Sequence, residues 1–235
     1  MFKNIYLKIN EFGSSRIIGS AKHKSKREFF NFGYDKKSGF LLIDKDSQNI
    51  FSILDKDLSS VDIQEYLSLM YRDFKVEIIP EQFYFNNQKT TDTILFKEDN
   101  EGNKFAFIDR EFPPYGYALA GGMVDKGEDS LEANFRELKE ELNAGDVELV
   151  QDFGSIKSYE IRGSLHTRLV LVKANNPSEI VAGDDAASFI WLSKEEVLEK
   201  ISNSEIIPHH VDLINKGFEF LYTPDNNRNI KQKKH

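Results

Sequence analysis

Apolar and polar positions alternate in short runs along the first part of the chain. Four such runs, rich in Phe, Ile and Tyr, cover 2–10, 16–20, 28–34 and 39–43. Alternation of this kind is typical of strands. An apolar stripe at helical spacing follows over 61–74, with Ser59 as a helix start, and residues 75–85 return to alternation around Pro80. We therefore expect residues 1–88 to form a small α+β domain.

A polar stretch at 86–91 predicts a linker, and the pattern changes after it. Strands are expected at 93–96 and 105–108, around a polar turn, and a long helix at 130–142. Further strand patterns lie at 147–153, 155–161, 166–173 and 187–192, and helical patterns at 194–202 and 208–221. Strands mixed with helices over this length predict an α/β sandwich at 92–222.

Composition narrows the class of protein. The chain has 235 residues, no cysteine and a formal net charge of −8, so disulfides and thiolate metal sites are excluded. No apolar run approaches the ~20 residues that a membrane helix needs, and the negative charge disfavours binding to long nucleic acid. The polar and basic tail at 223–235 is expected to be a disordered terminus. A cytoplasmic protein with a small phosphorylated ligand fits these features.

The predicted helix at 130–142 carries the strongest chemical pattern, because one face is apolar and another is acidic. The apolar face consists of Leu131, Phe135, Leu138 and Leu142. The acidic face holds Glu137, Glu140 and Glu141 within roughly 100° of one another. Asp129 can cap the start of the helix, and Asn143 tolerates the left-handed conformation common at a helix end. Such carboxylates usually form a solvated face, but at this spacing they can also hold a hard divalent cation.

The spacing of these residues resembles the Nudix box. The matching positions are Gly122, Glu128, Arg136, Glu137, Leu138, Glu140 and Glu141. Asn143 stands where the box has a late glycine, and Ala144 stands where it has a larger aliphatic residue. The first exchange suits the backbone, and the second touches no predicted metal ligand. The sequence therefore resembles the Nudix hydrolase superfamily over about residues 92–222.

This resemblance implies a Nudix α/β/α sandwich with a mixed sheet, preceded here by the small α+β domain. The implied metal ligands are the Gly121 carbonyl, Glu137, Glu140 and Glu141. The metal would be Mg²⁺, with Mn²⁺ as an alternative. Glu140 would be either a further ligand or a general base. Glu128 and Arg136 would brace the loop and the helix.

The flanks of the box resemble those of ADP-ribose pyrophosphatases. A Pro-Pro-Tyr run precedes the box, and Pro208 with two histidines precedes the last helix. The implied substrate contacts are Arg110, Tyr115, Tyr117 and His166. Both tyrosines are equally suited to a position in the core. Glu179, Asp184 and Asp185 lie where the family often brings an extra carboxylate to the metals, and the two aspartates are candidates for the general base.

These features predict Mg²⁺-dependent hydrolysis of ADP-ribose to AMP and ribose 5-phosphate. The same chemistry on another nucleoside diphosphate sugar, or on a dinucleoside polyphosphate, is an alternative. A sensor that binds ADP-ribose without cleaving it is another, although the intact glutamates favour catalysis. The expected partner is a small nucleotide, with neither long nucleic acid nor a membrane. Residues 1–88 would form a homodimer interface or cover the active site.

Overall fold

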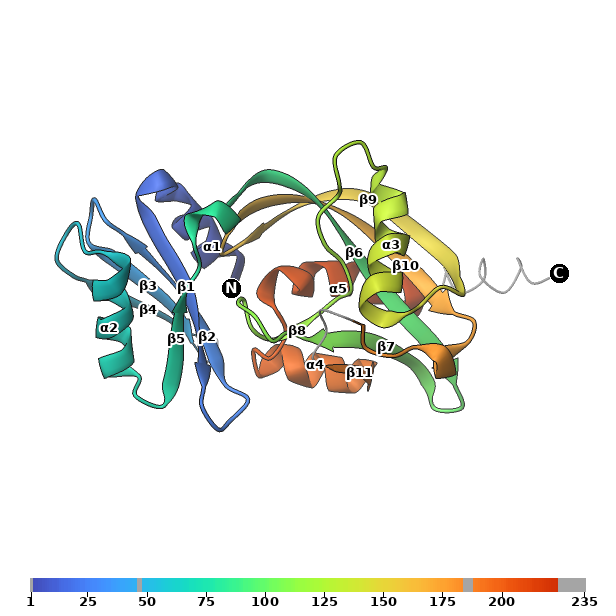
Figure 1. The fold of residues 1–235 in the computed structure, drawn as a ribbon. Coiled ribbons are helices and arrows are strands. Elements are labelled where there is room, and N and C mark those ends of the chain that lie inside the picture. The colour runs from blue at the N-terminus through green and yellow to red at the C-terminus, as the bar shows by residue number, and fades with distance from the viewer. Residues whose placement is uncertain (1, 46–47, 184–187, 224–235) are drawn as a thin grey trace.

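The computed structural model describes residues 2–45, 48–183 and 188–223. They form two β-sheets, each with helices packed on its faces (Figure 1). The α/β class expected from the sequence is confirmed. None of the helices in these ranges is long and apolar enough to cross a membrane. Residues 224–235, which are all of the predicted tail except Thr223, lie outside the described residues.

The first sheet is antiparallel, with the strand order β4-β3-β2-β1-β5. Its strands are β1 (Arg16–His23), β2 (Phe29–Asp35), β3 (Phe40–Lys45), β4 (Gln48–Ile53) and β5 (Phe74–Ile78). Helix α2 (Ser60–Met70) covers one face, where Ile63 and Leu67 join the buried core. Ser59 begins the helix through a reciprocal capping box with Asp62. The structure confirms this helix start and the predicted strands at 16–20, 28–34 and 39–43. Met70, at the end of the apolar stripe predicted over 61–74, is exposed and does not join the core.

The chain begins with a helix, α1 (Phe2–Glu11), so the predicted strand at 2–10 is wrong. Tyr6 and Ile9 are buried against the face of the sheet opposite α2, beside Ile18 and Leu42. Apolar residues three and four positions apart fit a helix as well as an irregular alternation. Packing against the sheet decides between the two structures. A 3-10 turn, η1 (Gly13–Ser15), then leads into β1.

The second sheet is mixed, because β10 runs parallel to β6 while its other strand pairs are antiparallel. Its strands are β6 (Phe85–Asp99), β7 (Gly102–Asp109), β8 (Tyr117–Ala118), β9 (Val147–Glu160), β10 (Gly163–Ala174) and β11 (Ser188–Ser193). Helix α3 (Ser130–Leu142) packs on one face. Helices α4 (Lys194–Ser202) and α5 (Pro208–Tyr222) pack on the other (Figure 1). This arrangement is the predicted α/β/α sandwich.

Two sequence predictions differ from the second sheet in detail. Residues 86–91, predicted to be a linker, continue β6 and pair with β10. The two strands predicted at 147–153 and 155–161 are one strand, β9, with Gly154 at a positive φ of 71° where its pairing shifts register. We propose that the boundary between the two units lies near residue 84, after the 3-10 turn η2 (Glu81–Phe83).

The two units of the chain, residues 1–84 and those after them, touch at the end of β9 and at the β9–β10 turn. The Asn10 side-chain amide donates to the Glu160 carbonyl at 3.1 Å, and the Arg16 guanidinium donates to the Arg162 carbonyl at 2.9 Å. These contacts hold the first sheet beside the β9–β10 turn.

Candidate active site

The glycine pair before α3 brings the backbone close to strand β6. The Thr93 N–H donates to the Ala120 carbonyl at 2.8 Å, and the Thr91 N–H donates to the Gly122 carbonyl at 2.9 Å. A Cβ at Gly121 would lie 2.0 Å from the Thr91 carbonyl oxygen, so this approach requires glycine. In an antiparallel pair, the backbone groups of alternate residues face the partner strand. The N–H and C=O of Gly121 therefore face away from β6.

Two glutamates of α3 converge on this segment. The Gly121 N–H donates to Glu141 Oε2 at 2.8 Å. A Cβ at Gly122 would lie 2.4 Å from Glu137 Oε1, so the Glu137 carboxylate fills the space that a side chain would take. The Glu137 side chain is 13% exposed, and burial raises its pKa, while the charge of Arg136 acts in the opposite direction. Helix and backbone thus form a cluster of oxygen atoms at the end of α3.

Arg136 ties the loop to the acidic face of α3. Its Nε and Nη2 donate to the two carboxylate oxygens of Glu128, at 2.9 and 3.1 Å. Its Nη1 donates to Glu137 and to Glu140, at 2.8 and 2.9 Å, and Nη2 also donates to the Met123 carbonyl at 3.0 Å. The hydrogen bonds from Arg136 lower the pKa of Glu128. A planar guanidinium suits such two-pronged bonding, and this geometry supports the predicted bracing role.

A cleft of about 340 Å³ opens beside the two glutamates. The charged residues that line it are Asp92, Arg110, Glu137, Glu141, Glu160 and Arg162. Burial raises the pKa of Asp92 well above its ordinary value, and the charges of Glu141 and Glu160 raise it further. The four carboxylates outnumber the two guanidinium groups. This excess of carboxyl groups in one cleft fits a divalent cation.

A buried carboxylate and a buried imidazole face each other in the cleft. Asp92 and His210 are each 5% exposed. The Leu119 N–H donates to His210 Nδ1 at 2.8 Å, so the neutral imidazole carries its proton on Nε2. That Nε2 lies 3.6 Å from Asp92 Oδ1. Because burial holds the His210 pKa well below its ordinary value, His210 presents a neutral N–H to Asp92 at physiological pH.

His209 completes a group of three potential metal ligands. One ligand atom from each of Asp92, His209 and His210 lies within 4.8 Å of the others. The His210 tautomer argues against a cation among them, since Leu119 occupies the Nδ1 lone pair and Nε2 carries the proton. Burial lowers the pKa of His209 to about 3, and its Nδ1 lies 3.7 Å from Glu160. The two imidazoles therefore form a neutral wall of the cleft.

The structure brings together most of the residues predicted from the box. The predicted residues that line the cleft are Arg110, Gly121, Glu137 and Glu141. Those that join it through the Arg136 guanidinium are Glu128, Arg136 and Glu140. The Glu140 side chain is 57% exposed. Its position on the outer side of Arg136 favours bracing over metal binding.

Three predicted substrate contacts lie elsewhere. Tyr117 is 3% exposed and packs in the core between the sheet and α5. Of its two predicted positions, substrate contact or core, the structure shows the core position. Tyr115 lines a separate, basic cavity. His166 follows Leu165 in β10, and Leu165 lines the cleft. Because successive side chains of a strand point to opposite faces, His166 faces away from the cleft.

The predicted general base falls on the loop after β10. Asp184 and Asp185 lie outside the described residues, so their role stays a prediction. The loop that leads to them is fixed to the end of α3, because the Gly183 N–H donates to the Glu141 carbonyl at 2.7 Å. Glu179 ends the 3-10 turn η3 (Pro177–Glu179) within the same loop.

Sequence reasoning missed three charged residues of the cleft. Asp92 stands near the start of an apolar strand pattern, and a carboxylate there is unusual enough to serve as a signal. Glu160 ends β9, Arg162 lies in the β9–β10 turn, and the two residues form an ion pair. In the sequence they resemble ordinary surface charges. Only the tertiary structure shows that Glu160 is 2% exposed.

The chain is similar to several known proteins. The asymmetrical bis(5'-nucleosyl)-tetraphosphatase of Caenorhabditis elegans is 25% identical over 121 residues, which are 50% of this chain and 88% of the relative. A structure of the C. elegans Ap4A hydrolase has a TM-score of 0.47 and 22% identity, covering 58% of this chain and 99% of that one. The NUDIX domain of Shewanella oneidensis NrtR, crystallised with ADP ribose, has a TM-score of 0.48 and 18% identity, covering 70% and 99%.

The family model of the NUDIX domain matches residues 87–210 of this chain. That match covers more than half of the chain, including most of strand β6, the glycine pair, helix α3 and the two histidines of α5. The resemblance of the box and the fold of the second sheet agree with it. The chain belongs to the Nudix family.

Proposed function

We propose that this chain is a pyrophosphohydrolase that cleaves ADP-ribose to AMP and ribose 5-phosphate. The observation that carries the proposal is the pair of carboxylates, Glu141 against Gly121 and Glu137 against Gly122, beside a cleft that also contains arginines. Carboxylate oxygens can hold a divalent cation, and both such a cation and guanidinium groups can bind a diphosphate. The flanks that resemble ADP-ribose pyrophosphatases favour this substrate over others.

Glu137, Glu141 and the Gly121 carbonyl are the residues that would hold Mg²⁺ or Mn²⁺. When bound, such a cation would neutralise the diphosphate and lower the pKa of a water molecule. The Gly121 N–H orients one Glu141 oxygen, and Arg136 orients Glu137. Both carboxylates are thus positioned by the chain itself.

Arg110 is the residue best placed to bind the diphosphate. It lines the cleft, and its buried Nε has no hydrogen-bond partner among the residues that the structure describes. A buried donor without a partner costs free energy that a phosphate oxygen would recover. Water would add to one phosphorus atom while the bond from that phosphorus to the bridging oxygen breaks, and the proton would pass to a carboxylate. Among the residues that the structure describes, Asp92, which faces the His210 N–H, is the candidate acceptor of this proton. Asp184 and Asp185, predicted from the sequence, are the other candidates.

A dinucleoside tetraphosphate is the second candidate substrate. The C. elegans relative carries the name of an asymmetrical bis(5'-nucleosyl)-tetraphosphatase. The same carboxylates would serve, and asymmetric cleavage of diadenosine tetraphosphate would release ATP and AMP. Both reactions release AMP, but the second product is ribose 5-phosphate from ADP-ribose and ATP from the tetraphosphate. The products therefore distinguish the two substrates.

The test is nucleotide release from ADP-ribose, diadenosine tetraphosphate and an ADP-hexose, each with Mg²⁺, with Mn²⁺ or with chelator. The wild type is expected to cleave ADP-ribose fastest, and Glu141→Gln to lose at least about a hundredfold in kcat. The control is Glu148→Gln, an exposed glutamate on β9, which should keep wild-type rates. Faster cleavage of the tetraphosphate would identify it as the substrate in place of ADP-ribose. Binding of ADP-ribose without cleavage of any compound would contradict the enzyme proposal and favour the ADP-ribose sensor.

A further inference from the structure

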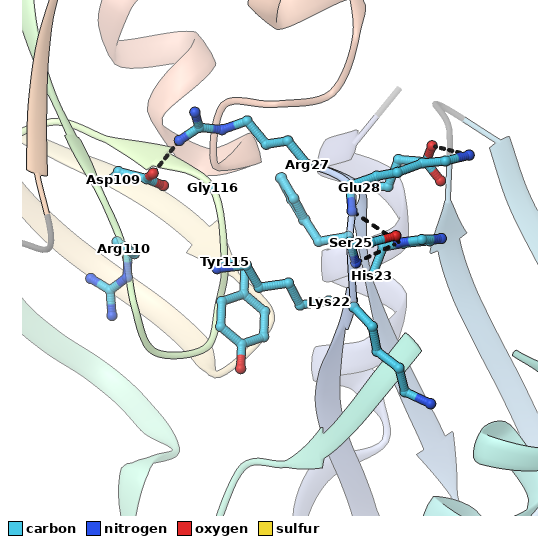
Figure 2. Close-up of a pocket in the computed structure, with 12 residues that line it drawn as sticks. Lys22, His23, Ser25, Arg27, Glu28, Asp109, Arg110, Tyr115 and Gly116 are labelled. Carbon is cyan, nitrogen blue, oxygen red and sulfur yellow. Dashed lines mark hydrogen bonds and ion pairs between the residues drawn. The ribbon is translucent and has the colours of Figure 1, made fainter. Parts of the chain in front are cut away.

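A second cavity, also of about 340 Å³, lies between the two units of the chain (Figure 2). One wall is the end of β1 with the β1–β2 turn, and the other is the segment at 109–116. Arg110 lines both this cavity and the cleft described above. Along the same segment, Pro114 borders the cleft and Tyr115 borders the second cavity. The two cavities are therefore neighbours.

The second cavity is basic in an acidic protein. Its cations are Lys22, Lys24, Lys26, Arg27 and Arg110, and its anions are Glu28 and Asp109. Five positive charges against two negative charges give a formal balance of +3, whereas the whole chain has −8. Concentrated charge of one sign in a concave site raises the local concentration of ions of the opposite sign. The cavity is thus suited to an anion.

Most of these cations already have partners within the protein. The Lys24 Nζ donates to a backbone carbonyl at 2.6 Å, and the Lys26 Nζ lies 3.6 Å from the Glu28 carboxylate. Arg27 pairs with Asp109 and its guanidinium lies 3.9 Å from the centre of the Tyr117 ring. The contacts of Arg27 hold the turn against the second sheet.

Lys22 differs from these residues. Its Nζ lies 5.3 Å from the centre of the Tyr115 ring, and Figure 2 shows the side chain extending from β1 toward that ring. Within the described ranges, no carboxylate lies close enough to form an ion pair with Lys22. Tyr115 is 4% exposed, so its ring is a fixed surface. Lys22 is the ammonium group in this cavity that can accept an anionic ligand without breaking an existing pair.

Hydrogen bonds and packing within the protein hold the backbone of both cavity walls in place without a ligand. The N–H groups of Ser25 and Lys26 both donate to His23 Nδ1 at 3.0 Å (Figure 2), which fixes the turn. On the opposite side, a Cβ at Gly116 would lie 2.8 Å from the Phe29 ring, and the φ of Gly116 is +129°. The ring of Phe29 thus packs on bare backbone. A cavity with fixed walls loses little conformational entropy when it binds a ligand.

We propose that this cavity binds a phosphate group through Lys22, above the ring of Tyr115. The phosphate belongs either to a dinucleoside tetraphosphate bound in the neighbouring cleft, whose phosphate chain extends beyond the cleaved bond, or to a separate phosphorylated ligand. In the first case the inference rests on the second candidate substrate of the proposed function. In both cases the first unit of the chain supplies a binding residue. This assigns a role in ligand recognition to the unit that the Nudix box leaves unexplained.

The experiment is calorimetric titration of the full chain with inorganic pyrophosphate in the presence of chelator, which removes metal-dependent binding at the glutamates. The wild type is expected to bind, and Lys22→Met to bind about ten- to a hundredfold more weakly, the loss typical of one charge-assisted contact. The control is Lys24→Met, which removes an equal charge two residues away. Absence of binding to the wild type, or equal weakening by both substitutions, would overturn the proposal.

A kinetic comparison then identifies the source of the phosphate. If the phosphate belongs to the substrate, Lys22→Met raises the KM for diadenosine tetraphosphate about tenfold at an unchanged kcat. The KM for ADP-ribose, whose only two phosphates lie at the cleaved bond, stays unchanged and serves as the control. If Lys22→Met weakens pyrophosphate binding but leaves the KM of every cleaved substrate unchanged, the site takes a separate ligand. Because the titration needs no turnover, it gives its answer even if the chain cleaves none of the substrates tested.

Discussion

Replacing Gly122 by alanine tests whether the chemistry depends on the position of the Glu137 carboxylate. The added Cβ would lie 2.4 Å from Glu137 Oε1 and 2.6 Å from its Cδ. Gly122 is not among the residues with positive φ, so alanine fits its backbone conformation. Any effect of Gly122→Ala therefore acts through the displaced carboxylate.

The size of the effect follows from the distances. Cβ atoms essentially never approach another heavy atom below 3.0 Å, so the Glu137 oxygen must withdraw by about 0.6 Å or more from its place at 2.4 Å. The 2.8 Å hydrogen bond from Arg136 would be strained or lost in the process. A misplacement of about 1 Å at a reacting site can cost roughly a hundredfold. We expect kcat to fall between about ten- and a hundredfold, which is about 1.4 to 2.7 kcal/mol in the barrier.

The assay is steady-state release of AMP at saturating metal, together with a titration of the metal and a thermal melt. The control is Gly145→Ala, because a Cβ there would meet no atom within 4 Å. Gly145→Ala should leave kcat unchanged. Wild-type kcat and metal dependence in Gly122→Ala would refute the assignment of Glu137 as a metal ligand. Unfolding of Gly122→Ala in the melt would instead mean that the glycine serves stability.

Two further predictions concern Arg136, which braces the loop against α3, and the buried side chain of His209. Arg136→Lys keeps the charge but loses the two-pronged bond to Glu128, so kcat and the melting temperature should both fall, kcat about tenfold; unchanged values of both would contradict the bracing role. The pKa of His209 in the folded protein is about 3, below the ordinary 6.5, so its contribution to stability is complete above pH 6.5 and is lost as the pH falls. At pH 5 the loss amounts to about 2 kcal/mol. Urea unfolding at pH 7.5 and pH 5 should therefore show a smaller pH dependence for His209→Gln than for the wild type, and equal dependences would disprove the neutral, buried state.

The local pattern of the sequence determined the elements whose signals are local. Helix α3 begins and ends where Asp129 and Asn143 predict, since the Asp129 carboxylate accepts the Leu131 N–H and Asn143 has a φ of 49°. The stripe that contains Leu138 and Leu142 is buried as its spacing requires. The box could be identified because its ligands and brace lie on one helix and the loop before it, where spacing in sequence fixes spacing in space.

The tertiary structure decided everything that depends on distant segments. The first ten residues form a helix because a sheet face is there to bury Tyr6 and Ile9. Asp92, Glu160 and Arg162 enter the cleft because the parallel pairing of β10 with β6 and the β9–β10 turn bring separate parts of the chain together. A single sequence contains the alternation that makes each strand, but the choice of neighbouring strand is a long-range packing event, so it leaves no local pattern.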